Sequence, residues 1–594
     1  MPSFAEIQRL LRSAELASLP LLSVGVLRNA TLEPIEPYLR YSAMRAGFRA
    51  DVHFSSFAGA FQEALDGREK VLSRSDLALV WLHFDTASPR LAREFPTLSR
   101  ADVQSELERT LGELRVLLAG ARRQTQATLL CVGFETPPLP ALGIADGEAA
   151  GFGQQAVVRA LNDGMREALA ALGNAYFLDL SQVLARLGVE RFYDPRYWHI
   201  GRAPYARDAL REVADTVTRY WVATRGRARK CLVLDCDNVL WGGIAGEEEF
   251  AGLALGTEHP GSAFREFQQE VKNLAARGVI LALCSKNEPE TVWRVFRDHP
   301  GMLLQERDIA ASRINWRDKA ENLREIAAEL NIGLDSLVFL DDSEFEVERV
   351  RSALPMVEAV HLPADRAVEY RNLLLAGGWF DTLSISEEDR TRSAMYRAEA
   401  DRRRAHDEIP DLTAYLRSLE MVAELALAGP GEIARVAQLT QRTNQFNLTT
   451  RRYSEDDIRT LVESPDSDVL TIRVSDRFGD AGLVGAAILR CQGPLAIVDT
   501  LLMSCRVLGR GVEQVLAESC VALAARRHCS EIEGHYLRSA KNGLVAEFWS
   551  SVGFEVVKRE AAEVVYRRRL SDSGSRPDWF KAIVGPFPVE TFDE

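Results

Sequence analysis

Three apolar runs in the middle of the chain each end in polar side chains, and this pattern constrains the fold more than any other feature. The runs are Cys231–Asp235, Val279–Ser285 and Ser336–Asp342. Segments with the apolar spacing of helices separate them, which is typical of an α/β domain with a buried parallel sheet. Because the carboxyl ends of parallel strands meet at one edge, we expect these polar side chains to form one cluster.

The predicted cluster suits phosphoryl transfer. Several carboxylates at one edge repel each other unless a cation lies among them, and Mg²⁺ prefers oxygen ligands. Asp235 is the expected nucleophile toward phosphorus, and Asp237 the expected acid and base. The predicted metal ligands are Asp235, Asp237, Asp341 and Asp342. The side chains expected to hold phosphoryl oxygens are Ser285, Lys286, Asn287 and Lys319. The alternative is that these aspartates only cap turns, which requires four ordered signals to coincide.

The chain has 594 residues, too many for a single core, and its pattern predicts a multidomain α/β protein. Residues 1–225 alternate apolar runs with amphipathic stretches, and residues 226–363 hold the predicted phosphoryl site. A charged helical connector is expected over 364–412. Residues 413–570 have more antiparallel character and predict an α+β domain. The remaining residues, 571–594, are expected to form a tail.

Bulk properties exclude several classes of protein. The net charge of −14, without a basic stripe, argues against a nucleic-acid partner. No window of about 18 consecutive apolar residues occurs, so we expect no membrane span. The eight cysteines include no CxxC pair, so we do not expect a zinc site or a disulfide framework. We therefore expect a reduced, cytoplasmic protein.

A second chemical motif lies in the stretch LLMSCRVLGRGVEQVL, residues 501–516. Glycines at the start of a helix leave backbone N–H groups free to bind phosphate. Cys505 precedes them, and a thiolate there attacks activated carbonyls well. His535 is a candidate base for it. The alternatives are that Cys505 is a small residue at a strand end and His535 a packed core histidine.

A third stretch, LTQRTNQFNLTTRRYS (439–454), is dense in amides and hydroxyls for a core helix. We expect it to line a polar pocket that holds an acyl group. A capped loop is an equally good interpretation. The candidate pocket residues are Asn444, Gln445, Asn447 and Thr449.

The central signals resemble the haloacid-dehalogenase (HAD) superfamily of phosphotransferases, with a Rossmann-like fold and a minimal cap. More narrowly, LDCDNVLWGGIAGE, CSKNEPE, INWRDKAEN and FLDDSEFEVERVR resemble the FkbH-like family of polyketide pathways. That resemblance implies D-1,3-bisphosphoglycerate as the phosphorylated substrate and Mg²⁺ as the metal. It implies a glyceryl thioester on the phosphopantetheine of an acyl carrier protein as the product, formed through Cys505 and by dephosphorylation.

The R-x-x-G-x-G pattern of 506–511 resembles the pyrophosphate loop of GNAT acyltransferases, in which the pantetheine arm lies between two splayed strands. AKNGLVAEFWSSVGFE (540–555) resembles the last helix and strand of that fold. The pantetheine-binding residues implied by this resemblance are Arg506, Gly509, Arg510, Gly511 and Asn542.

The N-terminal region resembles an SGNH-like domain through RNATLEP (28–34) and YDPRYWHIGRAPY (193–205). A working hydrolase of that kind needs a serine nucleophile and a closely spaced Asp-x-x-His pair. Here Asn29 and Ala30 follow the first strand, and Asp194 and His199 are spaced too widely. We expect no hydrolase activity and a scaffold or carrier-docking role.

Two other functions stay open from the sequence. One is a phosphatase fused to a coenzyme A-dependent acyltransferase, which needs no Cys505. The other is a non-catalytic scaffold that docks carrier proteins.

Overall fold

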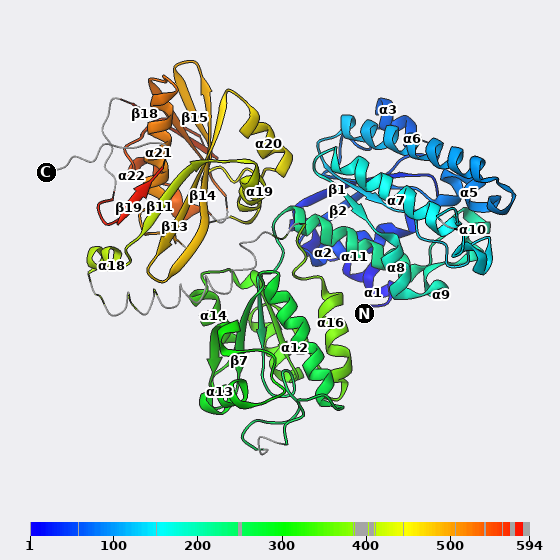
Figure 1. Cartoon of the computed structure of the whole chain (residues 1–594), viewed down its shortest axis with the longest axis horizontal. Coiled ribbons are helices and arrows are strands. Elements are labelled where there is room, and N and C mark those ends of the chain that lie inside the picture. Colours follow the sequence, from blue (N-terminus) through cyan, green and yellow to red (C-terminus); the bar gives the residue numbers. More distant parts are fainter. Residues whose placement is uncertain are drawn as a thin grey trace. The chain divides into compact units, whose positions relative to one another are not determined.

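The structure is a computed structural model. It describes residues 2–57, 59–149, 151–247, 252–383, 411–443, 445–504, 507–539, 542–560, 562–570 and 577–585, with single positions at 385, 402, 405 and 409. Backbone contacts divide the chain into two compact units, Met1–Thr224 and Arg225–Glu594 (Figure 1). Among the described residues, no helix has both the length and the apolar character needed to cross a membrane.

The first unit contains a five-stranded parallel sheet in the order β2-β1-β3-β4-β5. Its strands are β1 (Leu21–Arg28), β2 (Arg49–Phe54), β3 (Leu77–Trp81), β4 (Thr128–Val132) and β5 (Ala175–Leu178). Its helices are α1 (Phe4–Leu10), α2 (Glu36–Arg45), α3 (Ala60–Asp66), α4 (Phe84–Ala87), α5 (Pro89–Arg93), α6 (Arg100–Gln124), α7 (Gln154–Ala170), α8 (Leu180–Leu187), α9 (Val189–Phe192), α10 (Pro195–Gly201) and α11 (Arg207–Thr224).

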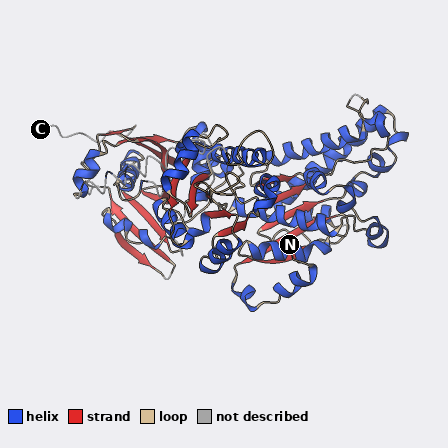
Figure 2. Ribbon diagram, turned by 90° about the horizontal axis from the view of Figure 1, so that it is seen from below, coloured by secondary structure: helices blue, strands red, loops and turns tan. Residues whose placement is uncertain are grey.

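Helices cover both faces of this sheet (Figures 1 and 2). Alternate residues of each strand point to opposite faces, so Leu79 packs with α2, α8 and α11 while Val80 packs with α3, α6 and α7. Both side chains are at most 1% exposed. A sheet buried on both faces explains why these strands read as continuous apolar runs.

The second unit begins with another five-stranded parallel sheet, in the order β10-β9-β6-β7-β8. Its strands are β6 (Cys231–Leu234), β7 (Ile280–Ser285), β8 (Ile309–Ile314), β9 (Leu337–Asp341) and β10 (Glu358–His361). Its helices are α12 (Gly261–Ala276), α13 (Pro289–Asp298), α14 (Lys319–Glu329), α15 (Glu344–Ala353) and α16 (Tyr370–Gly377). Helices α12, α13 and α16 cover one face, and α14 and α15 the other.

The rest of the second unit is built around a nine-stranded, mostly antiparallel sheet. Its strands are β11 (Val422–Leu427), β12 (Phe446–Asn447), β13 (Ser467–Asp476), β14 (Gly479–Gln492), β15 (Leu495–Met503), β16 (Glu531–Leu537), β17 (Glu555–Arg559), β18 (Glu563–Arg569) and β19 (Ala582–Val584). Its helices are α18 (Leu412–Ser418), α19 (Ile433–Arg442), α20 (Glu455–Glu463), α21 (Val512–Arg526) and α22 (Phe548–Ser551). Helices α21 and α22 pack on one face, and α19 and α20 on the other.

The predicted multidomain α/β fold with parallel sheets is confirmed. Within the expected connector, 364–412, the described helix α16 packs on the second sheet through Tyr370 and Leu374. Residues 386–401 of that connector lie outside the described residues.

Candidate active sites

The carboxyl edge of the second sheet gathers three carboxylates around one ammonium group. Oxygen atoms of Asp235, Asp341 and Asp342 lie within 4.8 Å of one another. Lys319 Nζ lies 3.1 Å from Asp235 Oδ2 and 2.5 Å from Asp341 Oδ2. Asp235 follows the central strand β6, the two other aspartates lie at the end of β9, and Lys319 begins α14. The order β10-β9-β6-β7-β8 therefore brings together groups that are up to 107 residues apart in sequence.

Local structure holds Lys319 at this position. Asp318 caps α14, because its Oδ1 accepts hydrogen bonds from the N–H groups of Ala320 and Glu321 at 2.8 and 3.2 Å. The first residue of the helix then points its long side chain into the cluster, where it is 3% exposed. Burial lowers the pKa of Lys319, but the carboxylates of Asp235 and Asp341 outweigh it and raise that pKa, so the ammonium stays charged.

One atom of the cluster is unsatisfied in a way that fits a metal. Asp235 Oδ1 is buried and has no hydrogen-bond partner among the described residues. A buried carboxylate oxygen without a partner is unfavourable unless a cation binds it. Asp235, Asp341 and Asp342 together supply the oxygen ligands that Mg²⁺ prefers. The residues present therefore fit a divalent cation.

Burial and mutual repulsion act on the acids of this cluster. Burial, followed by the charge of Asp235, raises the pKa of Asp341 to about 6 and also raises that of Asp342. Lys319 acts in the opposite direction on both groups. A dense set of acids that are hard to ionise without a cation is typical of a functional site.

Asp237 is oriented differently from the other three aspartates, and its carboxylate lies outside the group of potential metal ligands. Its Oδ1 accepts hydrogen bonds from Trp241 Nε1 and the Ala245 N–H, both at 2.9 Å. Its Oδ2 accepts one from Asn287 Nδ2 at 2.8 Å. Burial raises the pKa of Asp237 to about 6, which suits a group that gives and takes a proton near neutral pH. The arrangement favours the acid–base role over side-chain metal ligation.

The residues predicted to hold phosphate take different positions. Ser285 ends β7 and is 1% exposed. Asn287 binds Asp237, as described above, and so orients the acid. Lys286 forms an ion pair with Glu346 on α15 at 2.6 Å, so its charge is already partly compensated.

Sequence reasoning missed Asn238. Its Nδ2 donates to Asp342 Oδ2 at 3.1 Å, and its Oδ1 accepts from the Gly243 N–H at 3.0 Å. It therefore connects an acid of the cluster to the glycine-containing turn that follows. Asn238 has a left-handed φ of 53°, which asparagine tolerates better than most residues. An asparagine directly after Asp-x-Asp is the signal that identifies this position.

In the third sheet, the neighbouring parallel strands β15 and β16 are paired only at their beginnings. Leu495–Val498 pair with Glu531–Gly534, and the pairing then stops although β15 continues to Met503 and β16 to Leu537. A register shift in the β14–β15 pairing leaves Asp499 unpaired next to this point. Beyond this point β15 and β16 no longer pair with each other.

Two of the predicted acyl-pocket residues, Asn447 and Thr449, lie at this divergence. Asn447 is fully buried, and its carbonyl accepts a hydrogen bond from Asn542 Nδ2 at 3.1 Å. Thr449 is 2% exposed, and its hydroxyl lies 2.9 Å from that of Thr500 on β15. Gln445 is exposed, and Asn444 lies outside the described residues.

The predicted phosphate loop before α21 is covered by the chain itself at Gly511, whereas Gly509 is exposed. Gly509 and Gly511 have left-handed φ values of 75° and 84°. A Cβ at Gly511 would come within 2.8 Å of Trp579 and 2.9 Å of Pro577. Trp579 Nε1 also donates to the Arg510 carbonyl at 2.8 Å.

Charged side chains at this loop are directed to protein groups. Arg510 is 6% exposed and lies 3.7 Å from Asp476. Burial raises the pKa of Glu513, while the N–H groups of Glu513, Gly509 and Gly511 act to lower it, so this carboxylate takes the place an anion would occupy. Among the predicted pantetheine ligands, Arg510 and Gly511 are thus closed off from solvent.

His535 lies one residue beyond the last position at which β16 pairs with β15, and opposite Val565 of β18. Its Nδ1 is 2.9 Å from Glu563 Oε1, and its Nε2 is a buried atom without a hydrogen-bond partner among the described residues. That Nε2 lies 3.8 Å from Glu533 Oε2, so carboxylates flank both ring nitrogens. Cys505 and Arg506 lie outside the described residues, so the predicted Cys505–His535 pairing stays a prediction.

The N-terminal domain has no serine at the end of β1. Instead, Asn29 Oδ1 accepts a hydrogen bond from the His83 N–H at 2.6 Å, and Asn29 Nδ2 donates one to the His83 carbonyl at 3.3 Å. Asp194 caps α10 and binds Arg196 at 2.8 Å, so it orients no histidine as an Asp-x-x-His pair would. These contacts give Asn29 and Asp194 structural roles.

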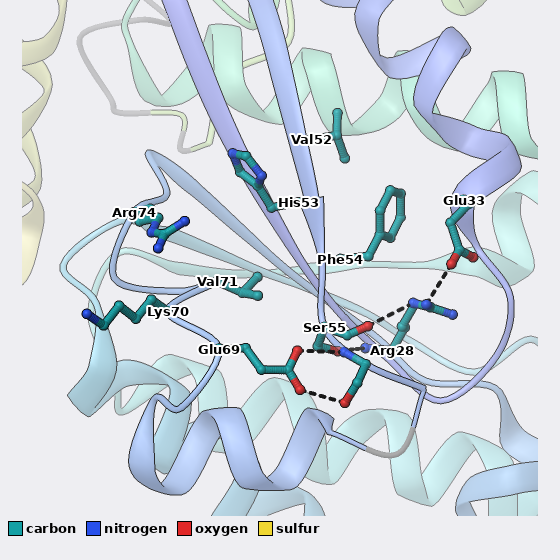
Figure 3. Close-up of a pocket in the computed structure, with 11 residues that line it drawn as sticks. Arg28, Glu33, Val52, His53, Phe54, Ser55, Glu69, Lys70, Val71 and Arg74 are labelled. Carbon is teal, nitrogen blue, oxygen red and sulfur yellow. Dashed lines mark hydrogen bonds and ion pairs between the residues drawn. The ribbon is translucent and has the colours of Figure 1, made fainter.

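A cavity of about 520 Å³ opens beside β1 and β2 of this domain (Figure 3). Its acids are engaged: Glu33 pairs with the buried Arg28 at 2.6 Å, and Glu69 accepts the Ser56 N–H at 2.7 Å. Figure 3 shows Lys70 and Arg74 on the same side of the pocket, opposite Arg28 and Glu33. The cavity is polar, and its described contacts single out no ligand.

No protein-family model and no curated protein matches the chain. The chain is similar to a crystal structure of the N-terminal part of the protein BF1531 from Bacteroides fragilis, described as containing a phosphatase domain complexed with Mg. The TM-score is 0.58 and the identity 25%, over 65% of this chain and 100% of that chain.

Weaker similarities involve N-acetyltransferases. The ribosomal-protein-S18-alanine N-acetyltransferase from Escherichia coli has a TM-score of 0.21 and 12% identity, over 26% of this chain and 96% of its own. The paia N-acetyltransferase from Thermoplasma acidophilum, in complex with coenzyme A, has a TM-score of 0.19 and 14% identity, over 25% and 98%. Over 65% of its own length, this chain shares the fold of the BF1531 fragment, which is described as containing a phosphatase domain.

Proposed function

We propose that this chain is a Mg²⁺-dependent phosphatase joined to an acyltransferase, which converts D-1,3-bisphosphoglycerate into a glyceryl thioester on an acyl carrier protein. The observation that carries the phosphatase half is the cluster of Asp235, Asp341 and Asp342 around Lys319. The Mg complexed by the similar BF1531 phosphatase domain supports the same metal here.

The phosphatase step uses the positions of two aspartates. Asp235 attacks phosphorus, so that a P–O bond forms to its carboxylate and the bond to the glyceryl oxygen breaks. Asp237, held by Trp241 and Asn287, gives its proton to that leaving oxygen. Water then attacks the aspartyl phosphate and gives a proton back to Asp237, which releases phosphate. Mg²⁺, when bound by the other carboxylates, supplies charge neutralisation at the phosphoryl oxygens.

The acyl step is assigned to the region that follows β15. The Cys505 thiolate attacks the acyl carbonyl of the acyl phosphate, a C–S bond forms, and phosphate leaves with the C–O bonding electrons. The pantetheine thiol then displaces Cys505 and loses its proton to a base. His535, oriented by Glu563, is the proposed base.

The polyketide-type product and the carrier protein are supported by the resemblance of the four sequence motifs. The covered loop disfavours the alternative, a coenzyme A-dependent acyltransferase.

Intact-mass spectrometry of the protein with 1,3-bisphosphoglycerate, Mg²⁺ and a holo carrier protein tests this function. Wild type is expected to load a glyceryl group on the carrier. The Asp235→Asn variant is expected to accumulate a phosphorylated glyceryl species, and normal product from it would refute the phosphatase assignment. Cys505→Ala is expected to lose the covalent acyl adduct, and an adduct that persists would refute the thiol role.

A further inference from the structure

The gap between the diverging strands β15 and β16 is filled by the chain's own backbone. Phe446 and Asn447 of β12 lie opposite Met503 and Leu502 of β15. The Leu448 N–H then donates to the Leu501 carbonyl at 3.1 Å. On the other side, the Leu537 N–H of β16 donates to the Leu448 carbonyl at 2.8 Å. Residues 446–448 therefore bridge two strands that do not bond each other at this level.

This bridging segment is short, and side chains hold it in place. Asn542 donates to the Asn447 carbonyl at 3.1 Å, and the Thr449 hydroxyl lies 2.9 Å from Thr500. Thr450, directly after it, has a left-handed φ of 53°, where the chain turns away. Phe446 and Leu448 are 5% and 0% exposed and pack in the core of this domain, so displacing the segment exposes apolar side chains and the open state is a minor one.

The groups that bind this segment would also bind an extended chain of amides. The Leu501 carbonyl accepts a hydrogen bond and the Leu537 N–H donates one, as edge strands do toward an added strand. A pantetheine arm is such a chain, because it carries two amides in an extended linker that ends in a thiol. Cys505 follows the end of β15 by two residues in the sequence.

We propose that residues 446–448 occupy the path of the pantetheine arm in the resting protein, and that the arm reaches the thiol by displacing them from between β15 and β16. The identity of the ligand rests on the proposed function. The displacement itself rests on the backbone pairing around Leu448.

This arrangement makes the site selective for an arm delivered by a protein. When the competent state is a minor one, the apparent affinity falls by the fraction that is open. A carrier that docks elsewhere on the chain raises the local concentration of its arm to about millimolar, which offsets that loss. Free pantetheine has no such advantage, so it is expected to open the segment only at much higher concentration.

Hydrogen exchange measured by mass spectrometry on the full-length protein tests the displacement. A holo carrier protein is expected to speed exchange in the peptide that spans 446–448 and leave peptides of β13 unchanged. The apo carrier, which lacks the arm, is expected to change neither. Thr449→Val removes the hydrogen bond between the Thr449 and Thr500 hydroxyls. It is expected to speed basal exchange at 446–448 about fivefold, as the loss of one hydrogen bond implies. Thr471→Val, at another buried threonine hydroxyl, is the matched control and is expected to leave it unchanged.

The outcomes separate this inference from the proposed function. Acyl transfer to the holo carrier with unchanged exchange at 446–448 would overturn the displacement and leave the function intact. Faster exchange without acyl transfer would support the displacement and refute the function. If the holo carrier produces neither effect, both are refuted.

Discussion

Lys319 Nζ lies 2.5 Å from Asp341 Oδ2, so an ammonium group is built into the carboxylate cluster. Replacing Lys319 by Met should remove a positive charge that stabilises both the acids and a bound phosphoryl group. We expect kcat for phosphate-ester hydrolysis to fall by about 10²- to 10³-fold, as for other electrostatic catalytic groups. Steady-state phosphate release measures this. The control is Lys272→Met. Lys272 lies on α12 and donates a hydrogen bond to the Leu303 carbonyl, and this variant should stay within about twofold of wild type. Equal activity of Lys319→Met and wild type would exclude Lys319 from the site.

Mg²⁺ should stabilise the folded protein through the same cluster. A ligand that binds only the native state at 100 times its Kd adds about 2.7 kcal/mol to the free energy of unfolding. Denaturant unfolding with and without Mg²⁺, followed through alkylation of Cys231 or Cys284, reports on this domain. Asp341→Asn should abolish the Mg²⁺-dependent increase. Asp298→Asn, at an exposed helix end, should retain it. An increase that persists in Asp341→Asn would place the metal elsewhere.

Glu135 should make the stability of the first unit depend on pH. Burial raises its pKa to about 7, well above the value of a carboxyl group in an unfolded chain. The native state therefore holds this proton between about pH 4.5 and 7 while the unfolded state releases it, so stability falls as pH rises through that window. The full effect is about 3 to 4 kcal/mol.

Glu135→Gln should remove this loss and be more stable than wild type at pH 8 but not at pH 4.5. Gln retains an acceptor for the Tyr193 hydroxyl, which lies 3.0 Å from Glu135. Urea dependence of Cys131 labelling measures the unfolding of this unit, since Cys131 is its single cysteine in the sequence. His83, whose pKa burial lowers to about 4, acts in the opposite direction in both proteins and cancels in the difference. Equal stability of the two proteins at pH 8 would contradict a protonated Glu135.

The cover over Gly511 should exclude coenzyme A. Trp579→Ala uncovers the glycine, and Glu513→Gln removes the carboxylate beside the loop N–H groups. We expect the double variant to bind coenzyme A at least about tenfold more tightly than wild type in calorimetry, since an anion site at a helix start becomes available. Binding of inorganic phosphate serves as the small-anion comparison. Tight binding of coenzyme A by wild type would show that the loop is already open.

The sequence alone predicted that Asp235, Asp341 and Asp342 lie close together, because residues that follow parallel strands meet at one sheet edge. The sequence did not predict the contacts of Asn238 or the Lys286–Glu346 ion pair, since these contacts depend on how a turn and a helix pack. The amide-rich stretch 439–454 shows the same limit. Its composition indicated a polar site, but whether it lines a gap or fills one depends on where β15 and β16 separate.

The four-residue pairing of β15 with β16 also has a mechanical consequence. The strands β11, β13, β14 and β15 form one ladder, and β16, β17 and β18 form another. Within the described part of the chain, the strand pairing that joins them is that of Leu495–Val498 with Glu531–Gly534. The two ladders are thus joined along a short line of strand pairing. Helix α21 crosses this line on one face of the sheet and packs against residues of both ladders. Under force or partial denaturation the two halves should separate along this line before either half loses its own strands.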